Sequence, residues 1–229
     1  MAVTPSPGHV PFKVTATLRG GLCVDQPYGL DLAGLLAAQV RRCEGTRMSS
    51  DGAADLALPL SVCATGSDWH WAATCVQLNN DPEEIPEPRT FFQVPDLRHA
   101  HQYAIQPIPQ VLVSKGPYRD VMQPSPVVMC GEATWWGVGD LAKIERLLAS
   151  VRFIGRRRTT GEGMVTGWTF EEVTGNPDRV THLGAGDSLL RPCPPPCADQ
   201  LEVDYRLGWY ALRPPSWNPD LLIESAMAP

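Results

Sequence analysis

Proline and glycine set the strongest limit on what this chain can fold into. Its 229 residues include 23 prolines and 20 glycines. Both residues interrupt regular elements, and proline also lacks the backbone N–H, so the composition predicts short strands and many loops rather than long helices. Hydrophobic residues still make up 43% of the chain, which is enough to bury a core. We therefore expect a folded protein that is rich in turns.

The first third of the chain contains segments with the periodicity of regular elements. Apolar and polar residues alternate over 12–19, which predicts a half-buried strand. Residues 30–43 carry apolar side chains at helical spacing and two arginines near the end, where cations suit the helix dipole. Residues 58–65 and 69–77 flank a Gly-Ser-Asp turn and predict a β-hairpin.

The middle of the chain begins with a proline-rich, partly acidic stretch, residues 79–126, which we interpret as an insertion of loops and short strands. Residues 127–136 predict one strand. Asp140 is a plausible N-cap for a helix whose apolar stripe runs over 141–151. Met164 and the alternating residues after it predict a further strand.

The order of these elements predicts an α+β protein with a ferredoxin-like (RRM-like) βαββαβ plan and an insertion before the second helix. We assign residues 1–173 to this domain and 174–229 to a loop-rich C-terminal extension packed on it, with strand-like pieces at 201–207 and 209–217. No apolar run approaches the roughly 18 to 20 residues that span a bilayer, and the N-terminus has no signal-peptide pattern. We expect a cytoplasmic protein with no membrane partner.

A basic, glycine-rich run, RFIGRRRTTGEG at 152–163, is the strongest local signal for function. The net charge of −6 argues against a protein that coats nucleic acid with its whole surface, but it allows a local basic site. Arginine suits phosphate because its planar fork donates two hydrogen bonds at once. The glycines allow a close approach of backbone amides to phosphate or a positive φ. The run is not a P-loop, because it lacks GxxxxGK[ST] and follows a helix.

The run resembles the glycine-rich loop that follows the last helix in the repeat-associated mysterious protein (RAMP) superfamily of CRISPR proteins. With the opening strand FKVTATLRG, the helix LDLAGLLAAQV and the late segment YALRPPSW, the chain is similar to the Csf-type subunits of type IV, class 1, CRISPR effector complexes. The similarity extends over most of residues 12–217, and its specific motif is the loop. The loop carries one acid, Glu162.

The resemblance implies a non-catalytic subunit that holds the 5′ handle of the guide RNA (crRNA), contacts the backbone subunits and the large subunit, and meets the target nucleic acid indirectly. It also implies a β-hairpin thumb within 79–126. The RNA-binding residues that we predict are Arg152, Gly155, Arg156, Arg157, Arg158, Thr159, Gly161 and Gly163 in the loop, with Lys115 and Arg119 in the insertion. Trp69, Trp135 or Trp136 could supply a stacking platform for bases.

Two other functions remain open at this stage. One is a guide-RNA-processing endoribonuclease of the same superfamily, for which His99 and His101, with Tyr103, form the candidate catalytic group. The other is a protein, enzyme or adaptor, whose arginines bind a phosphorylated ligand. We expect no enzyme activity and no cofactor.

The seven cysteines are scattered, and several lie in apolar runs where cysteine acts as a small hydrophobic residue. Cys193 and Cys197 in PCPPPC could suggest zinc, but a closed site needs four ligands. The sequence offers no second close pair, and only isolated residues such as Cys43 or His182 could complete the set. We therefore predict no metal site and interpret the proline run as a stiff extended spacer.

Overall fold

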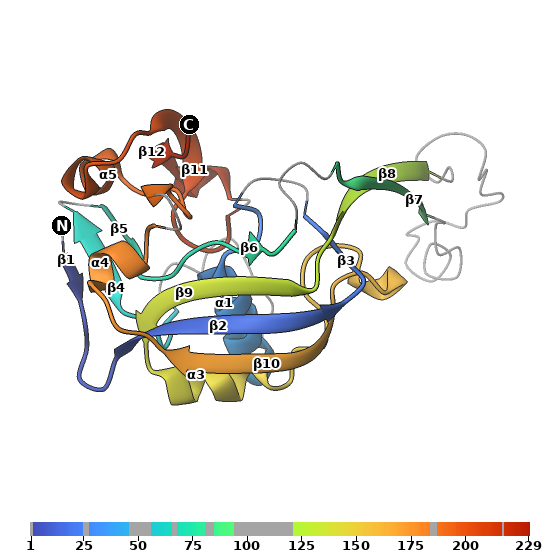
Figure 1. Ribbon diagram of the computed structural model, residues 1–229, viewed down its shortest axis with the longest axis horizontal. Coiled ribbons are helices and arrows are strands. Elements are labelled where there is room, and N and C mark those ends of the chain that lie inside the picture. Colours follow the sequence, from blue (N-terminus) through green and yellow to red (C-terminus); the bar gives the residue numbers. More distant parts are fainter. Residues whose placement is uncertain are drawn as a thin grey trace, which may run out of the picture.

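A computed structural model gives the fold of most of the chain (Figure 1). The described residues are 2–24, 28–45, 56–65, 68–80, 85–93, 121–183, 187–216 and 218–229. Within them the protein is a mixed α+β structure in which every strand pairing is antiparallel. The predicted α+β class is confirmed. None of the helices in these segments has the length and apolar character needed to cross a membrane.

The centre of the molecule is a four-stranded sheet in the order β10-β2-β9-β6. Its strands are β2 (Val10–Arg19), β6 (Gln77–Leu78), β9 (Glu132–Gly139) and β10 (Met164–Glu172). In β2 the buried residues alternate with more exposed ones, as the period-2 pattern predicted. The buried face packs against two helices, α1 and α3, to form the main hydrophobic core. Figure 1 shows α1 behind the sheet.

An aspartate precedes each of the two helices and caps it. Helix α1 (Leu32–Cys43) follows Asp31, whose side chain accepts a hydrogen bond from the amide of Ala33 at 3.1 Å. Helix α3 (Leu141–Leu148) follows Asp140, whose Oδ1 accepts from the amide of Lys143 at 3.0 Å. These caps satisfy amides that have no partner within the helix. The two predicted helices and the predicted N-cap at Asp140 are confirmed, but α1 begins two residues after the predicted start and α3 ends at Leu148, before the end of the predicted stripe at residue 151.

The single strand predicted over 127–136 is wrong. The chain forms two strands there, β8 (Val121–Met129) and β9, which are separated at Cys130 and Gly131. Strand β8 joins a different sheet, in the order β3-β8-β7, with β3 (Gly21–Cys23) and β7 (Glu87–Gln93). Residues 127–130 are all apolar and Ala133, Trp135 and Trp136 are apolar as well, so the sequence pattern did not reveal the change of sheet.

Strands β7 and β8 pair from Glu87↔Val127 to Gln93↔Val121. They lie within or beside the stretch where the sequence predicted an inserted hairpin, and Figure 1 shows them extending away from the central sheet. Pro88 and Pro126 face each other across the ladder. The predicted RNA-binding residues of the insertion, Lys115 and Arg119, lie outside the described residues.

A second body of structure forms from the N-terminal end, a hairpin and the last quarter of the chain. Strands β1 (Ala2–Thr4), β4 (Val62–Thr65) and β5 (Asp68–Trp71) make a three-stranded sheet in the order β1-β4-β5, so the predicted hairpin is confirmed with shorter strands. The C-terminal region, defined here as 174–229, contributes two helices and two paired strands. These are α4 (Pro177–Val180), α5 (Pro195–Leu201), β11 (Arg206–Ala211) and β12 (Leu222–Met227).

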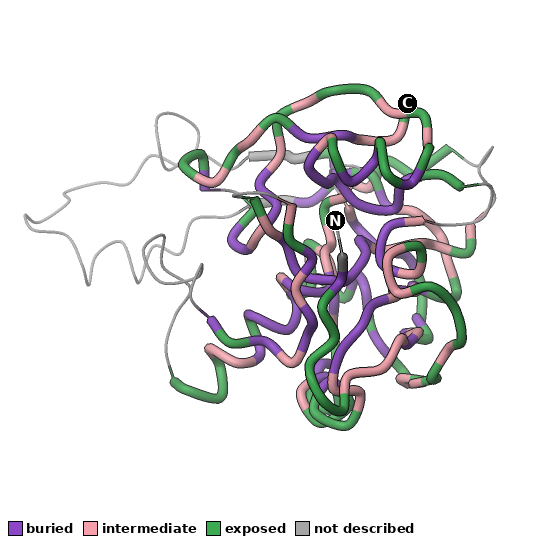
Figure 2. Tube along the Cα trace, turned by 90° about the vertical axis from the view of Figure 1, so that its left-hand side faces the viewer, coloured by how far each residue is buried: buried purple, intermediate pink, exposed green. Residues whose placement is uncertain are grey.

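These parts share a second hydrophobic cluster that includes Val3, Cys63, Leu189, Cys197 and Ala226. Figure 2 shows buried residues both in the sheet–helix body and in the C-terminal region. The packing joins strands from the beginning of the chain to elements near its end, so neither group buries this apolar surface alone.

Two predictions about the C-terminal region are wrong. The proline run of PCPPPC is not an extended spacer, because Pro195 and Pro196 form the first turn of α5. Proline fits there since the first amides of a helix have no intrahelical acceptor. The strand-like piece at 201–207 is also misplaced: Leu201 ends α5, and β11 begins at Arg206.

Candidate RNA-binding loop and a buried cysteine–histidine cluster

The arginine loop, defined as Gly155–Gly163, is fixed at its base by backbone hydrogen bonds. The amide of Ile154 donates to the carbonyl oxygen of Gly163 at 2.9 Å, and the amide of Gly163 donates to the carbonyl oxygen of Gly21 at 2.8 Å. The amide of Arg156 donates to the carbonyl oxygen of Cys23 at 2.9 Å. The loop therefore sits on strand β3, and a 3-10 turn over Arg158–Thr160 forms its tip.

The glycines of the loop serve its own conformation. Gly155 and Gly163 have φ of 74° and 68°. A Cβ at Gly163 would overlap the carbonyl oxygen of Ile154, and one at Gly155 would lie 2.7 Å from Leu22 Cδ1. Of the two roles left open by the sequence, positive φ with close packing is the one observed. The amides of Gly163 and Arg156 already donate within the protein and do not form a phosphate cradle.

The three consecutive arginines do not all face the same way, because Arg157 is turned away from Arg156 and Arg158. Arg157 has a φ of 60°, which turns the chain between its neighbours. Its guanidinium lies 4.9 Å from the centre of the Phe91 ring, and Nη2 donates to Ser125 Oγ at 3.4 Å, so it faces β7 and β8. Arg156 instead lines a cavity of about 260 Å³ beside Cys23 and Tyr210.

Arg158 lines two hollows. One of them shares Leu30 and Gly155 with the Arg156 cavity, and the other is the groove that we call the arginine groove. This groove has a volume of about 410 Å³ and lies between the end of α1 and the loop. Its other basic residues are Arg152 and Arg42, and Thr159 adds a hydroxyl. The side chains of these three groove arginines are exposed, and none of them forms an ion pair with a described acidic residue.

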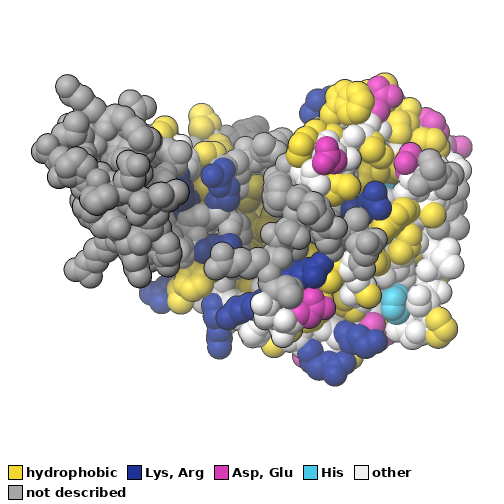
Figure 3. Space-filling model, turned by 180° about the vertical axis from the view of Figure 1, so that it is seen from behind, with side chains coloured by type: hydrophobic (Ala, Val, Ile, Leu, Met, Phe, Trp, Pro, Cys, Tyr) yellow, Lys and Arg dark blue, Asp and Glu magenta, His cyan; other side chains and the backbone are white. Residues whose placement is uncertain are grey.

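The groove therefore presents positive charge and planar donors, which is the chemistry that binds phosphate. Sequence reasoning missed Arg42, because its place at the end of a helix already had an explanation in the helix dipole. In Figure 3, acidic side chains gather mainly over the C-terminal region, whereas basic side chains lie nearer the β7–β8 side. The acidic net charge is thus unevenly distributed.

Glu162 is explained by a specific contact with strand β7. Its carboxylate accepts from Arg89 Nη1 at 2.7 Å, and its side chain is 9% exposed. Hydrogen bonds from Arg89 to Glu162 and Glu87 raise the pKa of the Arg89 guanidinium. The single acid of the loop thus pairs with Arg89 and leaves the charge of the groove unopposed. Together with the contacts of Arg157, it fastens the loop to the β7–β8 pair.

The proposed stacking tryptophans occupy different environments. Trp135 is fully buried and donates its indole N–H to the Leu30 carbonyl oxygen at 3.1 Å, so its suggested role as a platform for bases is wrong. Trp69 packs edge-on against Trp71, with 5.2 Å between the ring centres, and the guanidinium carbon of Arg213 lies 4.6 Å from the centre of the Trp69 ring. Trp136 is half-buried on the opposite face of β9 from Trp135. The candidate catalytic residues His99, His101 and Tyr103 lie outside the described residues.

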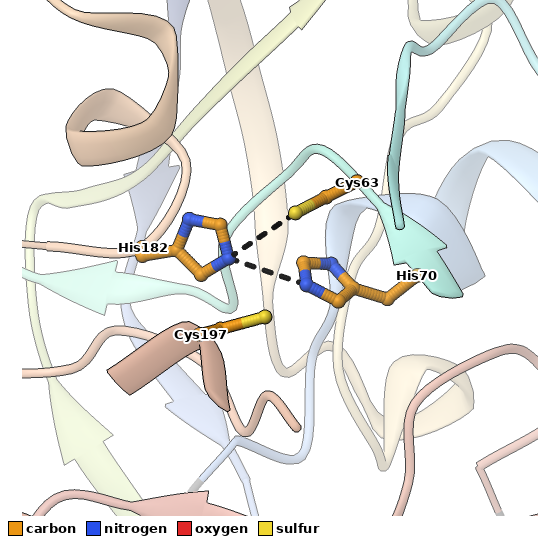
Figure 4. A group of neighbouring side chains, drawn as sticks. All are labelled: Cys63, His70, His182 and Cys197. Atoms are coloured by element: carbon orange, nitrogen blue, oxygen red, sulfur yellow. Dashed lines mark hydrogen bonds between the residues drawn. The ribbon is translucent and has the colours of Figure 1, made fainter. Parts of the chain in front are cut away.

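A second group of reactive side chains lies apart from the loop, in the interior between the β4–β5 hairpin and the C-terminal region. It consists of Cys63, His70, His182 and Cys197, whose ligand atoms all lie within 4.8 Å of one another (Figure 4). Burial, with the nearby charge of Arg191, lowers the pKa of His70 to about 3. Hydrogen bonds from Cys193 and Cys63 lower the pKa of the Cys197 thiol.

The sequence had drawn attention to Cys197 and His182 from this group, but it did not identify Cys63 and His70. Those two residues are direct cross-strand partners in the β4–β5 hairpin. Their positions on either side of the predicted turn were the signal in the sequence, because residues placed in this way face each other in a hairpin.

Residues 10–226 match the family model of the CRISPR type IV associated protein Csf3. The chain belongs to the Csf3 family. The match includes the central sheet, the arginine loop and nearly all of the C-terminal region, and it confirms the resemblance to Csf-type subunits of type IV CRISPR systems. Among curated protein sequences, none is significantly similar to this Csf3 chain.

Proposed function

We propose that this Csf3 chain binds the guide RNA of a type IV CRISPR ribonucleoprotein without cleaving it, and that it holds the 5′ handle. The observation that carries the proposal is the arginine groove, where Arg42, Arg152 and Arg158 line one hollow. The RNA backbone carries one negative charge for each nucleotide, and arginine forks bind such phosphates through paired hydrogen bonds.

The groove suits a binding role better than a catalytic one. Its polar side chains are mainly arginine and threonine, which bind phosphate but do not exchange protons near neutral pH. Cleavage at the 2′-hydroxyl needs a group that takes up that proton, such as a histidine. His70 and His182 are fully buried and point toward each other, so they do not reach the groove.

The topology supports the ferredoxin-like plan that the family resemblance implies. In chain order, β2, α1, β6, β9, α3 and β10 alternate as βαββαβ, and the sheet order β10-β2-β9-β6 places the first and third of these strands at its centre. In this proposal, the loop that follows α3 corresponds to the glycine-rich loop of that superfamily.

The protein also contacts other subunits in this proposal, namely the backbone and large subunits, and meets target nucleic acid through them. An exposed apolar surface on β11 and β12 supports such contacts. Trp209 is 70% exposed, and Leu207 and Leu222 are also exposed. Aromatic residues exposed in this way are enriched in protein interfaces.

Co-expression with the other type IV subunits and a CRISPR array tests the proposal. The complex should contain guide RNA whose 5′ end is protected from nuclease digestion. Arg152→Ala with Arg158→Ala should expose that end while the rest of the RNA stays protected. Equal protection of the 5′ end in wild type and variant would refute the role of the groove.

The matched control replaces Arg179 and Arg206, two exposed arginines in the C-terminal region, with alanine. It removes the same charge at another place and should leave the 5′ end protected. Loss of protection in both variants would indicate a general charge effect and would contradict a local site.

A further inference from the structure

We propose that Cys63, His70, His182 and Cys197 bind one Zn²⁺ ion, which fastens the β4–β5 hairpin to the C-terminal region. This inference is independent of RNA binding. It rests on the chemistry of the four ligand atoms, on the burial of their side chains, and on the hydrogen bonds that the Nδ1 atom of each histidine makes.

The four residues come from separate elements and converge on one point (Figure 4). Cys63 lies on β4, His70 on β5 and Cys197 on α5, and His182 follows α4. All four are at most 1% exposed. Two residues separated by 119 positions, Cys63 and His182, therefore meet in the interior.

The distances fit a tetrahedral ion. With Zn–N bonds near 2.0 Å and Zn–S bonds near 2.3 Å, ligand atoms lie roughly 3.3–3.8 Å apart. The two Nε2 atoms of His70 and His182 are 3.2 Å apart, and Cys63 Sγ lies 3.9 Å from His182 Nε2. Every pair of ligand atoms is within 4.8 Å, so inward shifts of less than about 1 Å bring the set to the spacing of a zinc site.

The hydrogen-bond partners of the two Nδ1 atoms indicate which nitrogen of each imidazole carries a hydrogen. His70 Nδ1 faces the Trp71 carbonyl oxygen at 3.0 Å, and His182 Nδ1 faces the Asp178 carbonyl oxygen at 2.6 Å. A carbonyl oxygen only accepts, so each Nδ1 carries the hydrogen. Where a ring carries only this one hydrogen, its Nε2 is unprotonated, and the two Nε2 atoms are the ones that face each other.

Two nitrogen lone pairs directed at each other at 3.2 Å repel unless a proton or a metal ion lies between them. A metal ion removes that repulsion. Metal-binding histidines commonly donate their other ring N–H to a backbone carbonyl, which fixes the tautomer and the orientation of the ring. Both histidines of this cluster have that arrangement.

The sulfur atoms complete the charge balance. Two thiolates neutralise a divalent ion, so the loaded site has no net charge, as a buried site requires. Thr65 Oγ1 lies 3.1 Å from Cys197 Sγ and can donate to a thiolate there. Zinc binding displaces the remaining thiol protons to solvent, and no redox change is involved.

Zinc is the metal that this donor set favours. A tetrahedral set of two sulfur and two nitrogen ligands is typical of zinc, whereas hard cations such as Mg²⁺ need oxygen ligands. All four ligands come from the protein and are buried, which is the pattern of a closed structural site rather than a catalytic one. The ion would tie together two parts of the chain that are distant in sequence.

Metal analysis of the full chain tests this inference directly. Protein purified without chelator should contain about one zinc ion per chain, and Co²⁺ exchanged into it should give the strong visible absorption of a tetrahedral site with thiolate ligands. Zinc below about 0.1 per chain, together with a weak octahedral cobalt spectrum, would overturn the proposal. The cobalt spectrum uses wild-type protein, so the test remains decisive even where variants fail to fold.

Variants then assign the ligands. Cys63→Ser and His70→Ala should each lose most of the zinc and the tetrahedral cobalt spectrum. Cys75→Ser is the matched control, since Cys75 is also buried but lies outside the cluster. It should retain about one zinc ion per chain. Full zinc content in the folded Cys63→Ser and His70→Ala variants would refute this ligand set.

Discussion

Replacing Arg152 and Arg158 together with alanine removes two of the three guanidinium groups that line the arginine groove. On a single strand, each phosphate that the protein no longer neutralises reduces the slope of log affinity against log salt concentration by about 0.7, so the slope of the double variant should be smaller by about 1.4. When the salt concentration rises from about 50 to 200 mM, the ratio of the wild-type association constant to that of the variant should therefore fall about sevenfold.

Fluorescence anisotropy with a labelled 5′-handle RNA, titrated at several salt concentrations, measures both slopes. The pair Arg179→Ala and Arg206→Ala removes the same charge from the C-terminal region and should leave the slope within about 0.3 of wild type. If the groove variant binds more weakly but keeps the wild-type slope, its arginines do not contact phosphate. That result would refute the electrostatic reasoning.

Three further expectations concern the loop and the chemistry. Arg89→Ala leaves the Glu162 carboxylate buried without its ion pair, so the free energy of unfolding in urea should fall by about 1–3 kcal/mol. Gly163→Ala should lower the melting temperature more than Gly161→Ala, because a methyl group at Gly161 meets no atom within 4 Å and costs only its positive φ, roughly 1–2 kcal/mol. A labelled precursor guide RNA incubated with the chain should remain uncut on a denaturing gel.

Each of these expectations has a contrary outcome. Unchanged unfolding of Arg89→Ala would mean that the pair with Glu162 contributes nothing to stability. Equal melting temperatures for the two glycine variants would contradict the close packing at Gly163. A discrete RNA product that disappears with His99→Ala or His101→Ala would establish the endoribonuclease alternative.

Periodicity in the sequence was sufficient to predict the elements that bury one face. The alternation over 12–19 and the stripe after Asp140 correspond to β2 and α3, because burial against a single core imposes that spacing. The same argument failed at 127–136. Strand β8 changes to β9 at Gly131, and the largely apolar residues on both sides of that glycine resemble one continuous strand.

The site was predicted less completely, because adjacency in the chain does not determine the direction of side chains. Arg157 has a left-handed conformation and packs on Phe91, so the arginine run does not present its three side chains as one cluster. Arg42 reaches the groove only through the packing of α1 beside the loop. The cysteine–histidine cluster likewise depends on long-range contacts, which a rule based on closely spaced ligands does not detect.

The attachment of the arginine loop to β7 has a mechanical consequence. Neighbouring residues of one short loop face opposite ways, with Arg158 lining the groove and Arg157 packing on Phe91. The Arg89–Glu162 ion pair braces the same side as Arg157. The loop therefore connects the groove rigidly to the β7–β8 pair. A ligand bound in the groove would also fix the orientation of β7 and β8 relative to the central sheet. Removing the Arg89–Glu162 ion pair should let β7 and β8 change their orientation while the arginines of the groove stay in place.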